Sequence, residues 1–153
     1  MPQLDIRQTN AAELMACPNL QDLISEYAAE SAVKGLPQAQ ANFEMYKRLE
    51  LVGALKFFGA FSGEALIGLI TLLTTPLPHY VERVATIESF FVFKEFRETG
   101  AGLKLLAAAK AMAKEIGAVG LLVSAPIGGQ LCQMLEAKRS FTETNRSFFT
   151  GLN

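Results

Sequence analysis

The chain has 153 residues, 50% of them hydrophobic and 19% charged, which is enough apolar material for a core and excludes a disordered tail or linker. Its 14 Lys and Arg against 15 Asp and Glu give a formal net charge of -1. We therefore expect no nucleic acid partner, because binding many phosphates requires a basic excess. The longest apolar run, residues 65–73, falls short of the ~20 residues that cross a bilayer, so we expect no membrane partner.

The N-terminal residues and the cysteines indicate a compartment. Residues 1–5 lack the basic and then apolar order of a secretion signal. Two cysteines, Cys17 and Cys132, do not make a disulfide framework, and no second cluster of Cys and His indicates a metal site. We expect a cytoplasmic protein with one domain over residues 1–153, reduced thiols and no bound metal.

The first third of the chain reads as one strand followed by helices. Apolar and polar residues alternate over residues 4–7, which predicts a short strand. Thr9 or Asn10 can cap the helix that follows, because a short side-chain oxygen accepts from free backbone N–H groups. Two further helices are expected, one beginning at Pro18 and running through residue 32, and one over residues 40–51.

The middle of the chain changes to the period of strands. Residues 55–61 and 65–74 predict a hairpin around Ser62 and Gly63, and residues 84–93 predict another strand. A helix is expected over residues 101–116, because Leu105, Ala109, Met112 and Ile116 share one face.

The last third adds one parallel strand and a final hairpin. Residues 121–125 form an apolar strand that Pro126 stops, and residues 129–138 form a short helix. A hairpin is expected from residues 141–142 and 147–150. The strand, helix and strand between residues 84 and 125 should form a right-handed parallel crossover, whereas the earlier strands should be antiparallel. The fold class is therefore α+β, a mixed and mostly antiparallel sheet with helices on its faces.

A glycine-containing turn opens the helix at residue 101. The first N–H groups of a helix have no internal partners and carry the positive end of its dipole, and glycine lets a ligand approach them. Gly100 and Gly102 therefore predict a pyrophosphate site, with Arg97 at its rim. A dinucleotide fingerprint is excluded because Leu105 stands at its third glycine, and no Gly-Lys-Ser/Thr ends a P-loop.

The pattern R-x-x-G-x-G from Arg97 to Gly102 resembles motif A of the GNAT acetyltransferase superfamily, where Q/R-x-x-G-x-G/A wraps the pyrophosphate of acetyl-CoA. The order of elements along essentially the whole chain and the upstream acidic residue Glu88 are similar to that family as well. Residues 77–80 and 124–126 look like those of small phage- or prophage-encoded members. The resemblance implies the GNAT fold, with a parallel pair of strands that splay apart.

The resemblance also implies acetyl-CoA as the cofactor. In the family, the pantetheine arm pairs with the main chain of the splayed strand, which here corresponds to Phe91, Val92 and Phe93. A backbone N–H near Phe91 or Val92 is the implied oxyanion donor. The pyrophosphate would meet a run of backbone N–H groups beside Arg97, those of Glu98, Thr99, Gly100, Ala101, Gly102 and Leu103.

For catalysis, Glu88 matches an acidic position that some members use as the base, directly or through a water. Many members place on the last helix a tyrosine that protonates the leaving thiolate, but residues 129–138 contain none. Tyr80, His79, Ser124 and solvent are the alternatives for that proton. Tyr27 and Glu30 lie where the family often builds the acceptor pocket.

The resemblance implies an N-acetyltransferase that moves the acetyl group to an amine by direct transfer in a ternary complex. The acceptor is a small molecule or a peptide or protein amine, and the protein is expected to be a homodimer. The missing tyrosine favours one alternative, a catalytically degenerate module that binds acyl-CoA and regulates another process.

Overall fold

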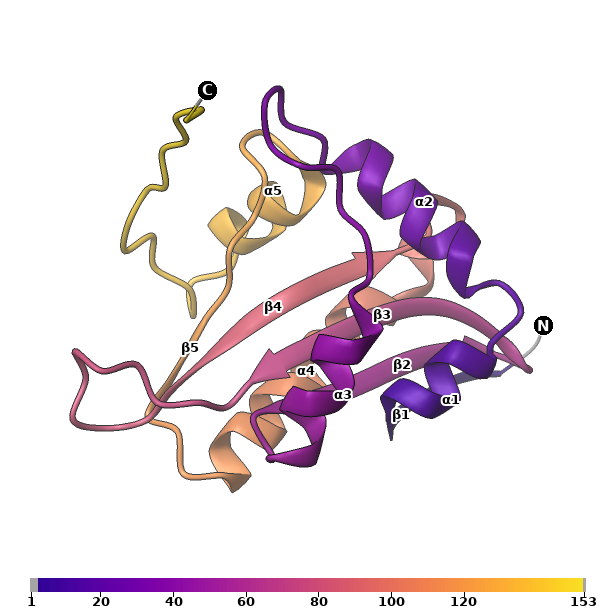
Figure 1. Cartoon of the computed structure of the whole chain (residues 1–153), viewed down its shortest axis with the longest axis horizontal. Helices are drawn as coiled ribbons and strands as arrows, with labels where there is room; N and C mark the ends of the chain where they lie inside the picture. Colours follow the sequence, from indigo (N-terminus) through magenta and orange to yellow (C-terminus); the bar gives the residue numbers. More distant parts are fainter. Residues whose placement is uncertain (1–2, 153) are drawn as a thin grey trace.

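A computed structural model describes residues 3–152 and shows one five-stranded sheet in the order β1-β2-β3-β4-β5 (Figure 1). The strands are β1 (Leu4–Thr9), β2 (Leu55–Ser62), β3 (Ala65–Leu73), β4 (Val84–Val92) and β5 (Gly120–Leu122). Neighbouring strands among β1 to β4 are antiparallel, whereas β5 runs parallel to β4. The predicted mixed, mostly antiparallel sheet is confirmed.

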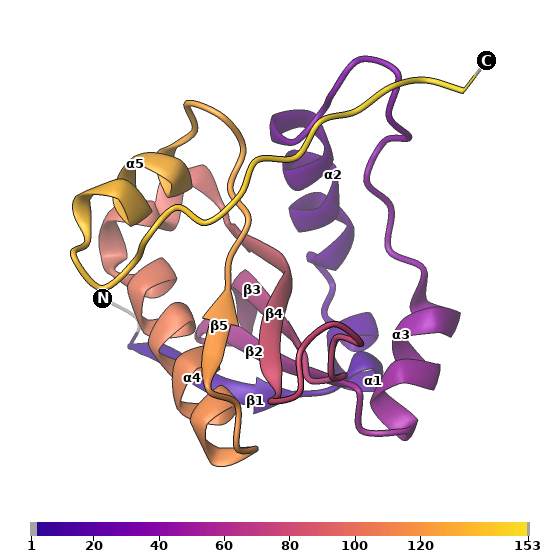
Figure 2. The same ribbon diagram turned by 90° about the vertical axis from the view of Figure 1, so that its left-hand side faces the viewer.

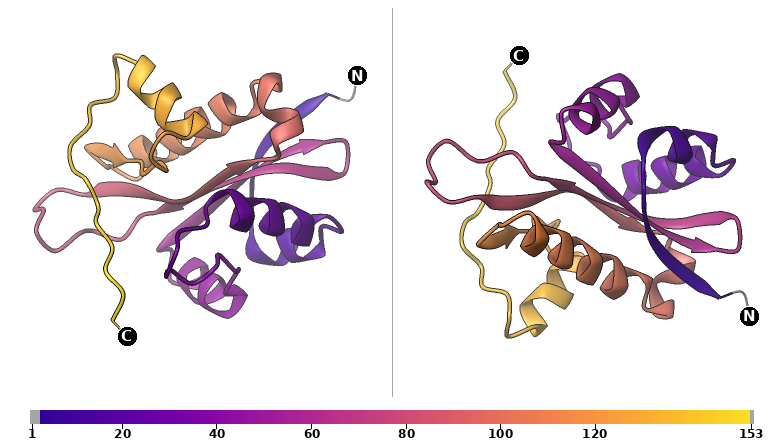
Figure 3. Two further views of the ribbon diagram at one scale, coloured as in Figure 1. Left: turned by 90° about the horizontal axis from the view of Figure 1, so that it is seen from above. Right: turned by 90° about the horizontal axis from the view of Figure 1, so that it is seen from below.

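Helices cover both faces of this sheet. In chain order the helices are α1 (Ala11–Ala16), α2 (Leu20–Glu30), α3 (Phe43–Leu51), the 3₁₀ helix η1 (Lys94–Thr99), α4 (Ala101–Glu115) and α5 (Gln130–Ala137). Figure 3 shows α1, α2 and α3 on one face and α4 and α5 on the other. Between residues 3 and 152, no helix has the length and apolar character needed to cross a membrane.

The α4 helix packs on the sheet through one stripe of small and apolar side chains. Leu105 and Ala109, one turn apart, are fully buried, and Leu106 and Ala113 are nearly so. Gly68 of β3 permits this close packing, because a Cβ there would lie 2.9 Å from the Val92 side chain and 3.2 Å from Leu105. The predicted amphipathic helix is confirmed. Its packing on the sheet keeps the first turn of α4 against β4.

A β-bulge in β4 shapes the face of the sheet that lies opposite α4. Thr71 of β3 pairs with Ser89, but its neighbour Leu72 pairs with Ile87, so Glu88 is the extra residue of β4. A bulge redirects the side chain of its extra residue and increases the local twist. The Glu88 carboxylate is accordingly exposed although the strand around it is largely buried.

The parallel strands separate after a short paired stretch. Pairing between β4 and β5 covers only Val84 with Gly120, Ala85 with Leu121 and Thr86 with Leu122. Beyond this point β4 continues to Val92 with β3 on one side only. The splayed pair is confirmed, although β5 is shorter than the expected 121–125.

Capping side chains correct the predicted helix ends. Asn10 caps α1 by accepting from the Glu13 amide at 2.8 Å, as expected. The second helix begins at Leu20 rather than Pro18, which precedes its N-cap residue Asn19. The third begins at Phe43 rather than residue 40, because Asn42 accepts from the amide of Met45. The 3₁₀ helix η1 is not predicted.

The predicted final hairpin is wrong. Residues 138–152 contain no strand, and this segment runs from α5 across the molecule toward the loop between α2 and α3 (Figure 2). The Phe149 ring lies against Gly35 of that loop, while Phe148 is 91% exposed. The two predicted strands, of two and four residues, could form few ladder hydrogen bonds with each other. An isolated hairpin of this size has marginal stability in water.

Candidate active site

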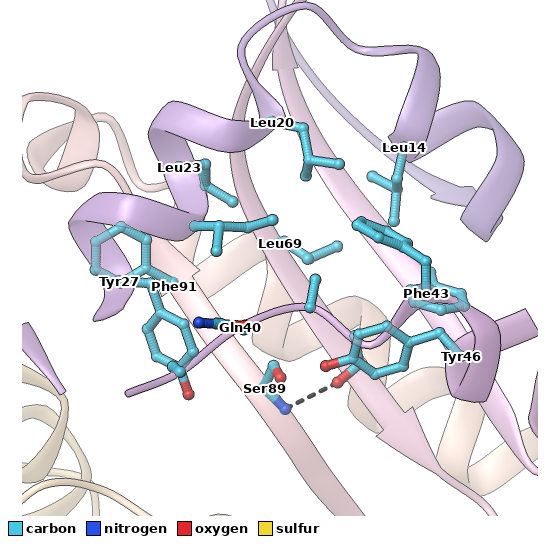
Figure 4. Close-up of a pocket in the computed structure, with 15 residues that line it drawn as sticks. Leu14, Leu20, Leu23, Tyr27, Gln40, Phe43, Tyr46, Leu69, Ser89 and Phe91 are labelled. Atoms are coloured by element: carbon cyan, nitrogen blue, oxygen red, sulfur yellow. Dashed lines mark hydrogen bonds between the residues drawn. The ribbon is translucent and has the colours of Figure 1, made fainter. Parts of the chain in front are cut away.

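Glu88 lies at the centre of a cluster of hydroxyl groups. Thr71 Oγ1 and Ser89 Oγ donate to its Oε2 atom at 2.7 and 2.6 Å. The Tyr46 hydroxyl is 3.2 Å from both carboxylate oxygens. The Ser89 amide in turn donates to Thr71 Oγ1 at 2.8 Å (Figure 4). Most of these bonds converge on one oxygen, so the carboxylate is held in place while Oε1 has a single partner.

Two tyrosines with perturbed acidity surround this carboxylate. Burial raises the pKa of Tyr27, and the negative charge of Glu88 raises it further. Burial also raises the pKa of Tyr46, with Glu88 contributing in the same direction although a hydrogen bond with Ser89 opposes it. Both phenols are therefore weaker acids than a free tyrosine, and the Tyr46 hydroxyl donates to Glu88.

A groove of about 570 Å³ runs from Glu88 to the start of α4. Its walls come from α2, β4, the first turn of α4, the segment after β5, and α5. It brings together most of the site residues that the sequence predicts: Tyr27, Glu30, Glu88, Phe91, Val92, Arg97, Gly100, Gly102, Leu103 and Ser124.

The first turn of α4 offers an anion site at the far end of the groove. Gly100 is the N-cap residue with φ of 85°, and its position has no capping side chain. Within the described residues, the Ala101 amide donates to Thr99 Oγ1 at 3.3 Å, and the Lys104 amide donates to the Gly100 carbonyl at 3.1 Å. The amides of Gly102 and Leu103 remain free at the groove wall, so the turn fits a pyrophosphate.

Other members of the predicted pyrophosphate site lie elsewhere. Glu98 and Thr99 belong to η1, and neither lines the groove. Ala101 is fully buried against the sheet. The sequence places the anion contact over residues 98–103, but the inserted 3₁₀ helix turns the first of these residues away from the groove.

The main chain of β4 is only partly available to a ligand. The Phe93 amide donates to the Ile67 carbonyl at 3.0 Å, toward β3. Because main-chain groups alternate in direction along an antiparallel strand, those of Phe91 face β3 as well, and those of Val92 face the gap. Of the three residues expected to pair with a pantetheine arm, Val92 alone offers its main chain, while Phe91 contributes its side chain to the wall.

Arg97 connects three sides of the groove. Its Nε donates to the Val92 carbonyl at 3.0 Å, and one terminal nitrogen pairs with Glu30 at 2.6 Å. The other terminal nitrogen is 3.3 Å from Gln130 of α5, and the guanidinium lies 5.1 Å from the Phe91 ring centre. The sequence predicts that Glu30 belongs to the pocket for the acetyl acceptor. In the structure its carboxylate neutralises the charge of Arg97 in the cofactor groove.

The predicted proton donors do not all reach the groove. His79 and Tyr80 lie on the loop between β3 and β4, where their ring centres are 4.1 Å apart at a tilt of 43°, and neither lines the groove. Ser124 does line it. The predicted helix α5 contributes Leu131 and Met134 at this wall, and neither side chain can donate a proton.

A second, smaller cavity of about 60 Å³ adjoins the first (Figure 4). Tyr27 and Phe91, whose ring centres are 5.4 Å apart, line both cavities. Ser89 lines the smaller cavity and Glu88 the larger one, so the carboxylate stands where the two meet.

Comparison with known families settles the class. The family model described as the acetyltransferase (GNAT) family matches residues 20–136. The chain belongs to the GNAT acetyltransferase family. The enzyme class and the cofactor expected from the sequence, an N-acetyltransferase that uses acetyl-CoA, follow from this membership. No curated protein matches the chain.

Solved structures of acetyltransferases share the fold at low identity. An aminoglycoside acetyltransferase from an uncultured soil metagenomic sample, in complex with sisomicin, has a TM-score of 0.73 at 20% identity, covering 98% of this chain and 97% of that one. AAC(6')-Iy in complex with the bisubstrate analogue CoA-S-monomethyl-acetylneamine has a TM-score of 0.72 at 21% identity, covering 99% of both chains. Ribosomal-protein-alanine N-acetyltransferase from Brucella melitensis biovar Abortus 2308 has a TM-score of 0.69 at 18% identity, covering 97% of both chains.

These neighbours confirm the GNAT fold of this chain. Their names include both aminoglycosides and a ribosomal protein as acceptors, so the fold is compatible with small-molecule and protein amines. The cytoplasmic location, the likeness to phage-encoded members and the homodimer stay predictions.

Proposed function

We propose that this GNAT acetyltransferase moves the acetyl group of acetyl-CoA directly to an amine held beside Glu88, in a ternary complex. One observation carries the proposal: a single groove joins the Glu88 carboxylate to the free amides of Gly102 and Leu103. An acyl donor that places its pyrophosphate on those amides extends along Val92 toward Glu88.

Each residue of the groove then has a chemical task. Acetyl-CoA supplies the thioester carbonyl that the amine nitrogen attacks. Glu88 accepts the proton of the amine through Oε1, and the hydroxyl cluster keeps the carboxylate in position. The Val92 N–H faces the gap and can stabilise negative charge on the carbonyl oxygen, a contribution that is typically ~3 kcal/mol.

The departing sulfur needs a proton when the carbon–sulfur bond breaks. Tyr27 and Ser124 are hydroxyl groups on the groove wall, and Tyr27 is the more acidic because it is a phenol. We assign the thiolate proton to Tyr27, with Ser124 and solvent as the alternatives.

The test follows release of the free CoA thiol while acetyl-CoA and an amine are both varied. Direct transfer gives intersecting double-reciprocal lines, whereas parallel lines would indicate an acetylated enzyme and contradict the ternary complex. Glu88→Gln should lower kcat by about 10²–10⁴-fold and leave the KM for acetyl-CoA unchanged. Glu82→Gln, on the loop before β4, is the matched control and should behave like the wild type.

A degenerate acyl-CoA-binding module remains the alternative, since the wall that α5 offers carries Leu131 and Met134 and no tyrosine. That module would bind acetyl-CoA but release no thiol with any amine. Binding measured by calorimetry beside the thiol assay separates the two functions.

A further inference from the structure

The smaller cavity beside Glu88 is lined mostly by apolar residues. Leu14, Leu20, Leu23 and Leu69 form its inner wall, and aromatic rings close its ends (Figure 4). Most of its polar groups lie at the edge where Ser89 stands between Phe91 and Tyr46, and the covering loop adds the neutral amide of Gln40. This edge is also where the carboxylate of Glu88 is held by Tyr46 and Ser89.

Charge is missing from this cavity. None of its lining residues, all of which lie within the described part of the chain, is Asp, Glu, Lys or Arg. In the adjoining groove Glu30 is already paired with Arg97, which leaves Glu88 as the one carboxylate that a cationic acceptor would meet. A second ammonium group in this cavity would lose its water and find no carboxylate to pair with, and that transfer is costly.

The size of the cavity limits what can fill it. Its volume of about 60 Å³ is well below the roughly 150 Å³ of a cavity that holds benzene. It therefore has room for about two or three aliphatic carbons and not for an aromatic ring. The loop residues Ala39, Gln40 and Ala41 cover it, so a longer chain has no exit in that direction.

From these observations we propose that the acceptor is a short aliphatic primary monoamine, whose nitrogen lies at Glu88 and whose alkyl group fills the small cavity. The inference rests on the proposed function and names its acceptor class. It distinguishes this chain from enzymes whose acceptors carry several ammonium groups.

The first experiment compares two amines of equal length. Butylamine and 1,3-diaminopropane differ only in whether the far end is a methyl or an ammonium group. Burial of the terminal methyl favours binding by about fourfold, whereas a buried ammonium loses its water, so kcat/KM for butylamine should exceed that for the diamine by about tenfold or more. Benzylamine and neamine should be poor acceptors.

Two variants test whether the small cavity makes this choice. Ala41→Leu adds three carbons from the covering loop and should lower kcat/KM for butylamine by about tenfold or more, while ethylamine is affected less. Ala32→Leu, an exposed position outside the cavity, is the matched control. Leu69→Ala enlarges the cavity and should make benzylamine a better acceptor than it is for the wild type.

The outcomes separate this inference from the proposed function. A preference for the diamine or neamine, an Ala41→Leu variant with unchanged selectivity, or transfer to other amines but to no monoamine would overturn the aliphatic acceptor. Failure to bind acetyl-CoA, or binding without thiol release with any amine, would overturn the proposed function itself.

Discussion

Gly102 stands in the first turn of α4 although its backbone angles do not require glycine. A Cβ at this position would meet Phe90 and Val92 at 3.8 Å, which is ordinary contact, so alanine fits the folded chain. Glycine in a helix is less favourable than alanine by up to about 1 kcal/mol. The groove offers a reason for this cost, because a methyl group would project from the wall that carries the free amides.

Gly102→Ala should therefore separate stability from function. We expect the free energy of unfolding to rise by up to about 1 kcal/mol while the KM for acetyl-CoA increases about tenfold or more. Urea denaturation and thiol release measure the two effects. Gly120→Ala is the control, because this glycine has open space around it and lies outside the groove. A variant with unchanged KM would show that the phosphates bind elsewhere.

Glu13 gives a prediction on pH and stability. Hydrogen bonds from Thr9, at 2.6 Å, and from Arg7, at 2.7 Å, lower the pKa of this carboxyl below its ordinary value of 4.5. A lowered folded-state pKa means that these bonds stabilise the fold above the unfolded pKa, and that this stability is lost as the pH falls through the folded value.

Glu13→Gln should thus be less stable than the wild type near pH 6, and the difference should shrink toward about pH 3. Urea midpoints at both pH values provide the measurement. Glu64→Gln, in the turn after β2, controls for the loss of one charge. A difference that stays constant over this range would assign the effect to packing.

The sequence predicts some of these residues and misses others for a physical reason. Glu88 and Gly100 follow from a strand, a turn and a helix that are neighbours in the chain. The Tyr46 hydroxyl reaches Glu88 across 42 residues, and helical periodicity reveals only that Tyr46 faces the sheet. Nothing in the local pattern indicates that the bulge turns Glu88 toward that helix, so the hydroxyl cluster becomes visible only in three dimensions.

At the scale of elements, a contact between α2 and η1 affects how readily the groove binds an anionic cofactor. Arg97 bonds to the Val92 carbonyl and to Glu30 at once, and its side chain is 16% exposed. A phosphate that approaches this guanidinium must compete with the Glu30 carboxylate, which is more exposed and can move aside. Glu30 therefore opposes the binding of an anionic cofactor.

Glu30→Gln should lower the KM for acetyl-CoA by about two- to fivefold, the range expected from a partly exposed ion pair. The effect should shrink at high salt because mobile ions screen the carboxylate. Glu26→Gln, one turn earlier on α2 and bonded to the Lys94 amide, is the matched control. A KM that rises in Glu30→Gln would mean that Glu30 orients Arg97 for the cofactor.

Element types were more predictable than their limits. Two apolar runs around the Ser62-Gly63 turn predict β2 and β3, and the stripe of Leu105 and Ala109 predicts α4, because each pattern is carried by neighbouring residues of one local element. The 3₁₀ helix η1 has no such stripe, and none of its residues is buried. The erroneous final hairpin has the same origin, since short apolar runs such as residues 147–150 do not show whether a sheet edge is available.

For the whole molecule, the groove is a seam between two layers. Helix α2 lies on one face of the sheet and α4 and α5 on the other, and between them β4 and β5 have parted (Figure 3). A ligand in this seam contacts both layers and binds only the folded chain, so its binding free energy adds to the stability of the whole fold.

Acetyl-CoA at one hundred times its Kd should add about 2.7 kcal/mol to the free energy of unfolding. For a chain of this size, each kcal/mol raises the Tm by roughly 2–4 °C, so a shift of roughly 5–11 °C is expected. Gly100→Glu should abolish the shift, because it places a carboxylate where the pyrophosphate binds. This variant also lowers the Tm without ligand, since φ of 85° strains any other residue, so the decisive quantity is the change that acetyl-CoA produces. A full shift in Gly100→Glu would mean that acetyl-CoA is held away from the first turn of α4.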